Sequence, residues 1–272
     1  ISFTFSSIRW RTYWSYESNI MNYIRSKENA FFKLLKKMSI KKYRDEEKMF
    51  LVEGIKLLDF IDDIKFIIIK ESKISNFSEY VEKNNCYIFS DFLFDELSSQ
   101  NNSQGIILVL KYLEKNIDYK TEEIVILDNI QDPGNLGTLI RLIDAVGIKN
   151  IILTIGSCDI YNEKVVRSTM GSLFNVNIEY FSLKKLSEFL LKEKFNILVT
   201  ALEKDSISYD KMSLKEKNAI IFGNEGHGVS NDLINIANEK LIIPIYGKAE
   251  SLNVGIAAGV FLYKKKKKNR FK

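Results

Sequence analysis

Three short stretches in the second half of the chain hold most of the residues that could orient a ligand or bend the backbone. Eleven of the thirteen glycines lie between Gly134 and Gly259, and both prolines and the single histidine fall in the stretches 127–141, 220–230 and 242–254. An apolar run leads into each stretch, which predicts a buried strand followed by a loop that turns sharply or approaches a ligand closely. Three such loops in one half of the chain predict a single site.

The side chains in these loops favour orientation of a ligand over metal or phosphate chemistry. They offer two amides, a hydroxyl, a carboxylate and a guanidinium, from Asn135, Asn253, Ser251, Glu225 and Arg141. Neither the dinucleotide pattern G-x-G-x-x-G nor the phosphate-loop pattern G-x-x-x-x-G-K-[ST] occurs. No paired Cys and His residues stand at a metal-ligand spacing, so no metal site is predicted. The set suits a zwitterionic, adenosine-containing ligand together with a nucleophile that must be oriented.

The spacing within the loops matches three known patterns. Asn-x-Gly-x-x-x-Arg is met from Asn135 to Arg141, Gly-x-Glu-x-x-Gly-x-Ser from Gly223 to Ser230, and Ile-Pro…Gly…Ser-Leu-Asn-Val from Ile243 to Val254. These are similar to the three signature motifs of the SpoU (TrmH-type) 2′-O-ribose RNA methyltransferases of the SPOUT superfamily. The segment 164–174 resembles the helix that these enzymes place between the first two motifs. The chain departs from the family after the motif arginine, where Thr is frequent and Leu142 stands here.

The resemblance implies an enzyme that uses S-adenosyl-L-methionine to methylate a ribose 2′-hydroxyl of RNA. It also implies a homodimer of parallel-sheet α/β domains with a trefoil knot. It assigns catalysis to Asn135, Arg141, Glu225, Ser251 and Asn253, and cofactor binding to Gly223, Ile243 and Leu252. Because a guanidinium with a pKa above about 12 is a poor base, we expect Arg141 to orient the hydroxyl and to stabilise the developing oxyanion.

Residue types alone also allow roles without chemistry at several of these positions. Arg141 could form a helix-face salt bridge with Asp144, and Ile243 and Leu252 could simply pack in the core. His227 is expected to be a loop residue and not a catalyst.

The elements that must position the loops alternate regularly from Glu123 onward. Apolar strands are expected at 124–127, 151–153, 176–178, 197–199, 219–222 and 241–243. Helical patterns separate them at 136–146 and 165–173, after Ser182, from Ser230 and from Leu252. Strand–helix repeats with continuously apolar strands predict a parallel sheet covered on both faces.

The first half of the chain predicts a smaller α/β domain. Ser26 is expected to cap a helix whose apolar stripe is Phe31, Leu34, Leu35 and Met38, followed by strands at 50–52, 65–69, 87–89 and 106–110 and helices at 55–61 and 91–97. The stretch 50–56 resembles the opening of the L30e-like substrate-binding domain found before some SpoU catalytic domains. We therefore expect an RNA-binding domain at 21–111, a linker at 112–122, a methyltransferase domain at 123–264 and a basic tail at 265–272. Residues 1–20 are expected to be a leader translated from upstream, with Met21 as the start.

Composition narrows the class and the partners. The net charge is +5, but the tail from Lys264 holds seven basic residues and no acid, so the remainder carries 5 − 7 = −2. The segment 25–48 has nine Lys or Arg against four Asp or Glu. Both basic segments are candidates for contacts to RNA phosphates, and the alternative for each is a solvated surface. Two distant cysteines and no apolar run of about 18 residues predict a cytoplasmic enzyme without a disulfide framework or a membrane span.

Several functions remain open at this point. Ribosomal RNA is the favoured substrate, because the additional amino-terminal domain resembles ribosomal-RNA enzymes more than the tRNA enzymes with their short flanking helices. A tRNA 2′-O-methyltransferase is the alternative within the class. A noncatalytic RNA-binding or ribosome-assembly protein would have less reason to keep Asn135, Arg141, Glu225 and Asn253 together. A nucleotide-dependent oxidoreductase is disfavoured by the missing dinucleotide pattern.

Overall fold

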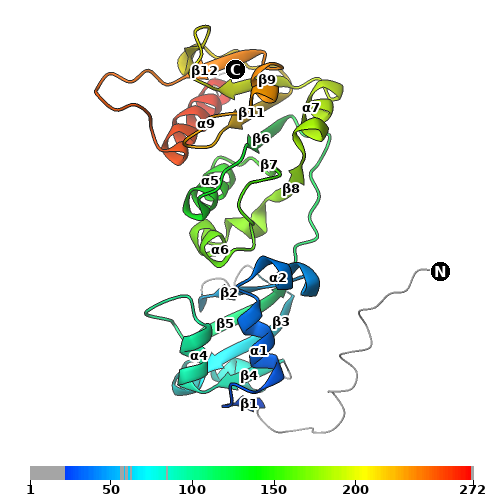
Figure 1. The fold of residues 1–272 in the computed structure, drawn as a ribbon, viewed down its shortest axis with the longest axis vertical. Coiled ribbons are helices and arrows are strands. Elements are labelled where there is room, and N and C mark those ends of the chain that lie inside the picture. Colours follow the sequence, from blue (N-terminus) through cyan, green and yellow to red (C-terminus); the bar gives the residue numbers. More distant parts are fainter. Residues whose placement is uncertain (1–21, 56–57, 59–60, 62, 84, 271–272) are drawn as a thin grey trace, which may run out of the picture.

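Two α/β units are stacked along the long axis of the molecule (Figure 1). The computed structural model describes residues 22–55, 58, 61, 63–83 and 85–270. The predicted leader and start residue lie outside these residues, as does part of the helix expected at 55–61.

The amino-terminal unit is a five-stranded mixed sheet with strand order β1-β4-β3-β5-β2. Its strands are β1 (Asn22–Ile24), β2 (Met49–Glu53), β3 (Ile64–Lys70), β4 (Cys86–Phe89) and β5 (Ile106–Lys111). Its helices are α1 (Ala30–Lys37), α2 (Lys41–Glu47), the 3₁₀ turn η2 (Glu71–Phe77), α3 (Ser78–Val81) and α4 (Asp91–Leu97). β5 runs antiparallel to β2 and β3, whereas β4 is parallel to β1 and β3.

Alternating side chains of this sheet pack on both of its faces. Phe32 and Leu35 of α1 and Phe94 of α4 cover one face, and Phe77 lies against the other. The predicted cap of α1 was wrong: Asn29 and not Ser26 accepts hydrogen bonds from the first free backbone N–H groups of the helix. Both residue types form N-caps, so the sequence offered two competing positions three residues apart.

The second unit is a seven-stranded, wholly parallel sheet with order β10-β12-β9-β11-β6-β7-β8. Its strands are β6 (Glu123–Leu127), β7 (Asn150–Thr154), β8 (Asn177–Phe181), β9 (Asn196–Thr200), β10 (Ile207–Ser208), β11 (Asn218–Phe222) and β12 (Glu239–Ile242). The helices are α5 (Pro133–Ala145), α6 (Glu163–Thr169), α7 (Leu183–Lys192), α8 (Asn231–Ile234) and α9 (Val254–Arg270), with 3₁₀ turns η3 (Ser172–Asn175) and η4 (Tyr209–Lys211). The predicted parallel sheet is confirmed, and the knot stays a prediction.

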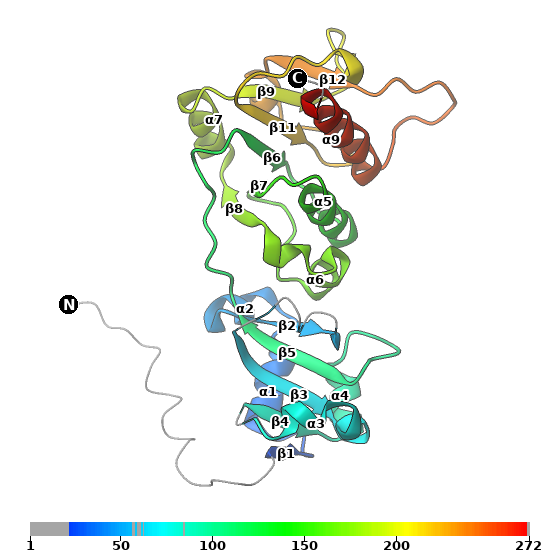
Figure 2. The same cartoon turned by 180° about the vertical axis from the view of Figure 1, so that it is seen from behind.

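Helices cover both faces of this sheet, as continuously apolar strands require. Along β6, Val125 and Leu127 face α5, α6 and α9, whereas Ile124 and Ile126 face α7 and α8. Figure 2 shows α5, α6 and α9 along one side of the sheet. The two core clusters on opposite faces hold the strands in one register, so the carboxyl ends of β6, β7, β11 and β12 meet at a common edge.

The segment 112–122 is fastened to the second unit and is not a free linker. Ile117 is buried, and its backbone N–H donates to Glu179 Oε1. Tyr112 stacks on Tyr161 with ring centroids 3.9 Å apart, and the N–H of Leu113 donates to the hydroxyl of Tyr161.

The carboxyl-terminal helix extends further than the sequence suggested. The predicted tail begins at Lys265, but α9 continues to Arg270. Lys265 is only 1% exposed, and its Nζ lies 2.9 Å from Glu123 Oε1 at the start of β6. This first residue of the predicted tail is therefore part of the packed domain. Among the described residues, no helix has the length and apolarity to cross a membrane.

Candidate active site

The three motif loops meet at the carboxyl edge of the parallel sheet. The first leaves β6 and enters α5, the second connects β11 to α8, and the third connects β12 to α9. In Figure 1 the third loop (orange) stands out beside the sheet before it returns to α9. Asp132 caps α5 by accepting a hydrogen bond from the N–H of Asn135 at 2.7 Å, and Pro133 occupies the first turn. This cap and proline fix where the first motif begins.

Three of the predicted catalytic side chains form one hydrogen-bonded chain. Asn135 Nδ2 donates to Glu225 Oε1 at 2.5 Å, and Asn253 Nδ2 donates to Asn135 Oδ1 at 3.0 Å. Asn253 Oδ1 in turn accepts from the N–H of Gly255 at the start of α9. The two side-chain contacts each join a different pair of loops across 90 or more residues of sequence. All three side chains remain solvent-accessible, so the chain is open to a substrate.

A buried carboxylate that the sequence reasoning missed lies beneath this chain. Asp128 is 1% exposed and directly follows β6. Its Oδ2 accepts from the N–H and the hydroxyl of Ser230, at 2.7 and 2.6 Å, and its Oδ1 accepts from the Thr154 hydroxyl at 2.7 Å. Asp128 therefore ties the first motif loop to the end of β7 and to the last residue of the second motif. A polar residue ending an apolar strand was the available signal.

The second motif loop closes on itself at Gly223. A Cβ at this position would lie 2.3 Å from the carbonyl carbon of Gly228 and 2.3 Å from the nitrogen of Val229, so only glycine fits. Asn224 holds the turn, because its Oδ1 accepts from the N–H groups of Gly226 and His227. His227 itself is exposed.

The first motif loop also contacts α6, the helix expected between the motifs. A Cβ on Gly137 would lie 2.4 Å from Ser168 Cβ and 2.8 Å from the carbonyl oxygen of Val165, which explains the glycine of the motif as a close helix–helix contact. Lys164 Nζ lies 3.7 Å from Asp132 Oδ2, beside the cap of α5.

Two predicted catalytic residues stand apart from the hydrogen-bonded chain. Arg141 lies exposed on α5, and within the described residues its guanidinium makes no hydrogen bond or ion pair. The alternative salt bridge with Asp144 does not form, because that carboxylate accepts from Lys149 and Asn175 instead. Ser251 is exposed in the third loop and, in the part of the chain that is described, has no side-chain hydrogen bond.

The residues predicted to bind the cofactor flank the same edge. Gly223 follows β11, Ile243 follows β12 and packs against the core, and Leu252 lies two residues before α9 with 37% of its surface exposed. Tight backbone turns, apolar side chains and amide groups at one edge fit an adenosine-bearing zwitterion, which needs close backbone approach and offers little net charge.

Comparisons with known families agree with this arrangement. Residues 122–263 match the model of the SpoU rRNA Methylase family, and residues 29–108 match an MRM3-like substrate binding domain. The chain is 34% identical over 248 residues to the 23S rRNA (guanosine(2553)-2'-O)-methyltransferase RlmP of Bacillus subtilis (strain 168), covering 89% of this chain and 98% of the relative. It is 30% identical to a tRNA (guanosine(18)-2'-O)-methyltransferase of Aquifex aeolicus (strain VF5), over 57% of this chain and 74% of the relative.

A solved structure extends the likeness to both units. The AdoMet-bound rRNA methyltransferase from Sinorhizobium meliloti superimposes with a TM-score of 0.80 at 27% identity, covering 91% of this chain and 98% of that one. The predicted RNA methyltransferase activity and the predicted cofactor are thereby confirmed. With its catalytic unit matched to the family model and a relative that it spans almost completely, the chain belongs to the SpoU rRNA methylase family.

Proposed function

We propose that this protein methylates a ribose 2′-hydroxyl of large-subunit ribosomal RNA. The observation that carries the proposal is the Asn253–Asn135–Glu225 hydrogen-bonded chain, which brings all three motifs to one open edge. The likeness to the 23S rRNA enzyme supports the substrate, because it covers both units, whereas the likeness to the tRNA enzyme covers 57% of the chain. A tRNA substrate remains the second candidate on the strength of that shorter match.

The chain's own residues would bind the cofactor mainly through the backbone. The turns at Gly223 and after Ile243, together with Leu252, would enclose the adenosine part. When bound, S-adenosylmethionine supplies an electrophilic methyl group on a sulfonium, so methyl transfer depends chiefly on how the nucleophile is positioned.

The remaining task is to bind and orient the ribose hydroxyl. The Glu225 carboxylate and the Asn135 amide form a fixed polar pair, since each is held by the other and Asn135 is held again by Asn253. Arg141, free of carboxylates among the described residues, is available to donate to the hydroxyl as negative charge develops on it. Ser251 would complete the polar wall once RNA and cofactor are in place.

We also propose that two copies of the chain pair through α9 and the third loop. Ile256 and Tyr263 are 60% and 57% exposed, and their spacing of seven places them on one face of α9. Tyr246 in the third loop is 97% exposed. Large apolar side chains gathered on one helix face and the neighbouring loop favour a protein partner.

A cytoplasmic location is proposed from the RNA substrate and the two free thiols, Cys86 and Cys158.

The proposal is tested by substituting Arg141. Arg141→Ala should lower turnover on a 23S rRNA fragment by on the order of 10²-fold or more, because a donor to the developing oxyanion is lost. Cofactor affinity and thermal midpoint should change little. Tritium transfer from labelled S-adenosylmethionine to 23S rRNA and to tRNA measures both the rate and the substrate class.

Lys184→Ala is the matched control, since Lys184 is an exposed cation on α7 at the opposite face of the sheet. Turnover of Arg141→Ala close to that of this control would remove Arg141 from the catalytic set. Transfer to tRNA alone would replace the ribosomal substrate with the second candidate.

A further inference from the structure

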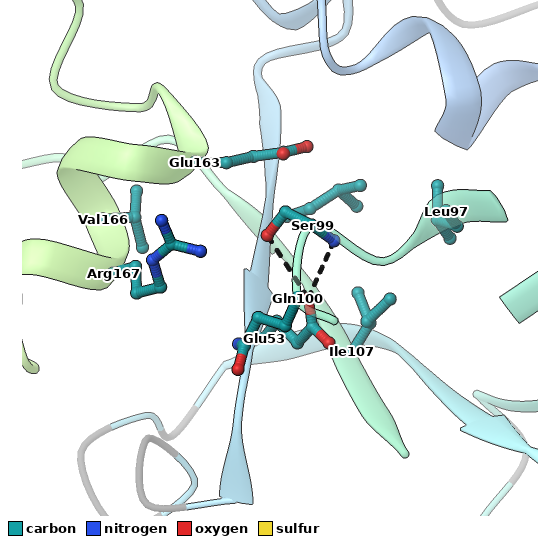
Figure 3. Close-up of a pocket in the computed structure, with 9 residues that line it drawn as sticks. Glu53, Leu97, Ser99, Gln100, Ile107, Glu163, Val166 and Arg167 are labelled. Atoms are coloured by element: carbon teal, nitrogen blue, oxygen red, sulfur yellow. Dashed lines mark hydrogen bonds between the residues drawn. The ribbon is translucent and has the colours of Figure 1, made fainter. Parts of the chain in front are cut away.

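A polar cleft separates the two units on the side of α6. Six residues from both units line a cavity of about 170 Å³: Ser39, Ser99, Asn162, Glu163, Lys164 and Arg167. A smaller adjoining cavity shares Ser99, Glu163 and Arg167 and continues toward Glu53 and Gln100. Figure 3 shows Glu163 and Arg167 projecting from one helix toward Ser99 and Gln100 of the other unit. This interdomain cleft is not part of the motif loops.

Two charged side chains in the cleft have no partner among the described residues: Glu163, which is partly buried, and Arg167, which is exposed. Glu53 is fully engaged, because its carboxylate accepts from the hydroxyls of Ser98 and Ser99 and from the N–H of Ser99. In contrast, among the described residues the side chains of Glu163 and Arg167 have no hydrogen-bond or ion-pair partner. They stand four residues apart on α6 and still do not pair with each other.

Burial makes the charged form of the Glu163 carboxyl less favourable than it would be in water. Burial raises the pKa of the Glu163 carboxyl, and the neighbouring Glu53 adds to that rise, while Arg44 and Arg167 oppose it. A half-buried carboxylate beside an unpaired guanidinium is a poor choice for stability alone. A ligand that donates to the first group and accepts from the second would satisfy both.

The order of these groups matches the polar groups around one nucleobase. Guanine presents two donors, N2–H and N1–H, on its Watson–Crick edge, and two acceptors, O6 and N7, follow them on the adjoining Hoogsteen edge. Residues four apart on a helix lie on one face with their Cβ atoms roughly 5–6 Å apart, so Glu163 offers acceptors beside the donors of Arg167. Adenine places an acceptor at N1, and cytosine and uracil lack the N7 acceptor, so neither pattern is met.

We propose that the interdomain cleft binds one unpaired guanosine of the RNA substrate, distinct from the methylated nucleotide, with Glu163 accepting from its Watson–Crick donors and Arg167 donating to O6 and N7. The inference rests on the proposed function and adds a specificity site to it. Lys164 connects the two sites: it lines the cleft, and its Nζ lies 3.7 Å from Oδ2 of Asp132, the cap of α5. A guanosine held here would fix the strand relative to Asn135.

The experiment combines protein variants with base analogues. Guanosines in a 23S rRNA fragment are replaced singly by inosine, which lacks the N2 amine, or by 7-deazaguanosine, which lacks the N7 acceptor. Fragment affinity is measured by filter binding, which reports the cleft whether or not methyl transfer occurs. One position, not the methylated one, should lose roughly tenfold or more in affinity with wild-type protein.

The variants locate that loss in the cleft. With Glu163→Gln, which keeps one of the two acceptors, inosine at that position should cost less affinity than it does with wild type. With Arg167→Ala, 7-deazaguanosine should cost none, because the donor is already gone. Cofactor affinity of both variants should stay near wild type, and both should still unfold cooperatively. Glu188→Gln and Lys192→Ala, an exposed acid and base with the same spacing on α7, are the matched controls.

Independent effects of base and residue at every guanosine would overturn the proposal, as would coupling confined to the methylated nucleotide. Absence of methyl transfer to any RNA, with the couplings intact, would instead remove the proposed enzyme activity and leave the guanosine site standing.

Discussion

The motif loops were predicted to form the active site, whereas the basic segment 25–48 was a candidate for RNA contacts with a solvated surface as the alternative, and the side chains of the two regions have different partners in the structure. Side chains of the motif loops reach across the fold to one another, as Asn135 does to Glu225 and Asn253. Most cationic side chains of the basic segment form ion pairs with carboxylates. Seven of its nine cations have an acidic partner within 4.0 Å: Arg25, Lys27, Lys33, Lys36, Lys41, Lys42 and Arg44.

The difference shows which sequence signals carry three-dimensional information. A motif with fixed spacing after a buried strand specifies backbone geometry, so its polar side chains must emerge at one edge. A run of like charges specifies only composition, and acids far along the chain, such as Glu71, Glu96 and Asp159, offset it. The basic segment therefore presents less positive charge than its sequence suggests, and its contact with RNA stays a prediction.

The largest effect is expected for Arg44, because this cation of the basic segment is buried and out of reach of RNA. It is 3% exposed, its Nη2 lies 2.7 Å from Asp159 Oδ2 in the other unit, and its Nη1 donates to the carbonyl of Met38. Arg44→Ala would leave a nearly buried carboxylate unpaired, so we expect a loss of roughly 3–5 kcal/mol of unfolding free energy. Chemical denaturation monitored by circular dichroism measures it.

Lys41→Ala is the control, since its pair with Asp45 is exposed and should contribute about 0–1 kcal/mol. Equal stability of the two variants would mean that Asp159 is solvated after all and that the interdomain pair does not hold the units together.

The motif loops are tested at Gly223. Gly223→Ala places a methyl group 2.3 Å from backbone atoms of Gly228 and Val229. Backbone atoms cannot move aside as the end of a flexible side chain could. The loop must open, and the strain should cost about 1–3 kcal/mol. Calorimetric titration should show S-adenosylmethionine affinity reduced by roughly tenfold or more. Gly226→Ala in the same loop meets its nearest atom at 3.5 Å and should bind normally. Comparable affinities for the two variants would place the cofactor elsewhere.

Glu163 in the interdomain cleft is expected to make the stability of the folded protein depend on pH. Its folded pKa is raised above the usual 4.5 by burial, so as pH rises the unfolded chain releases this proton first. The folded state then binds more protons, and stability falls from about pH 4.5 upward until the folded pKa is passed. Glu163→Gln should therefore be more stable than wild type at pH 7, with the gain vanishing below pH 4.5. A gain that persists in acid would point to packing and not to charge.

Much of the fold was predictable because its signals are local. Short apolar runs predicted the longer strands of the parallel sheet, and Ser182 caps α7 as predicted by accepting from the N–H of Lys185. The motif residues of the candidate site were predicted from the resemblance of their spacing to the motifs of a known family. Asp128 did not, because nothing in its neighbourhood reveals that its partners Thr154 and Ser230 lie 26 and 102 residues away.

Long-range charge pairing was the part that sequence could not supply. Lys265 was assigned to a basic tail because its neighbours are lysines. In the structure it forms an ion pair with Glu123 at the start of β6 and lies within the packed domain. Arg44 was counted as a surface cation for the same reason. In both cases a partly buried carboxylate more than 100 residues distant in the sequence determines where the cation lies, and the residues next to the cation in the sequence do not indicate this pairing.

The smallest expected effect concerns the exposed lysines of the basic segment. If Lys33, Lys36, Lys41 and Lys42 each contacted a phosphate, replacing all four by Gln would flatten the dependence of log affinity on log salt by roughly 0.9 per contact. Each instead has an acidic partner in the same unit, so we expect a slope change below about one, with cofactor affinity unchanged. Filter binding of a 23S rRNA fragment over a range of salt concentrations measures the slope. A change of three or more would mean that these exposed pairs, each worth little to the free protein, open when RNA arrives and release their lysines to it.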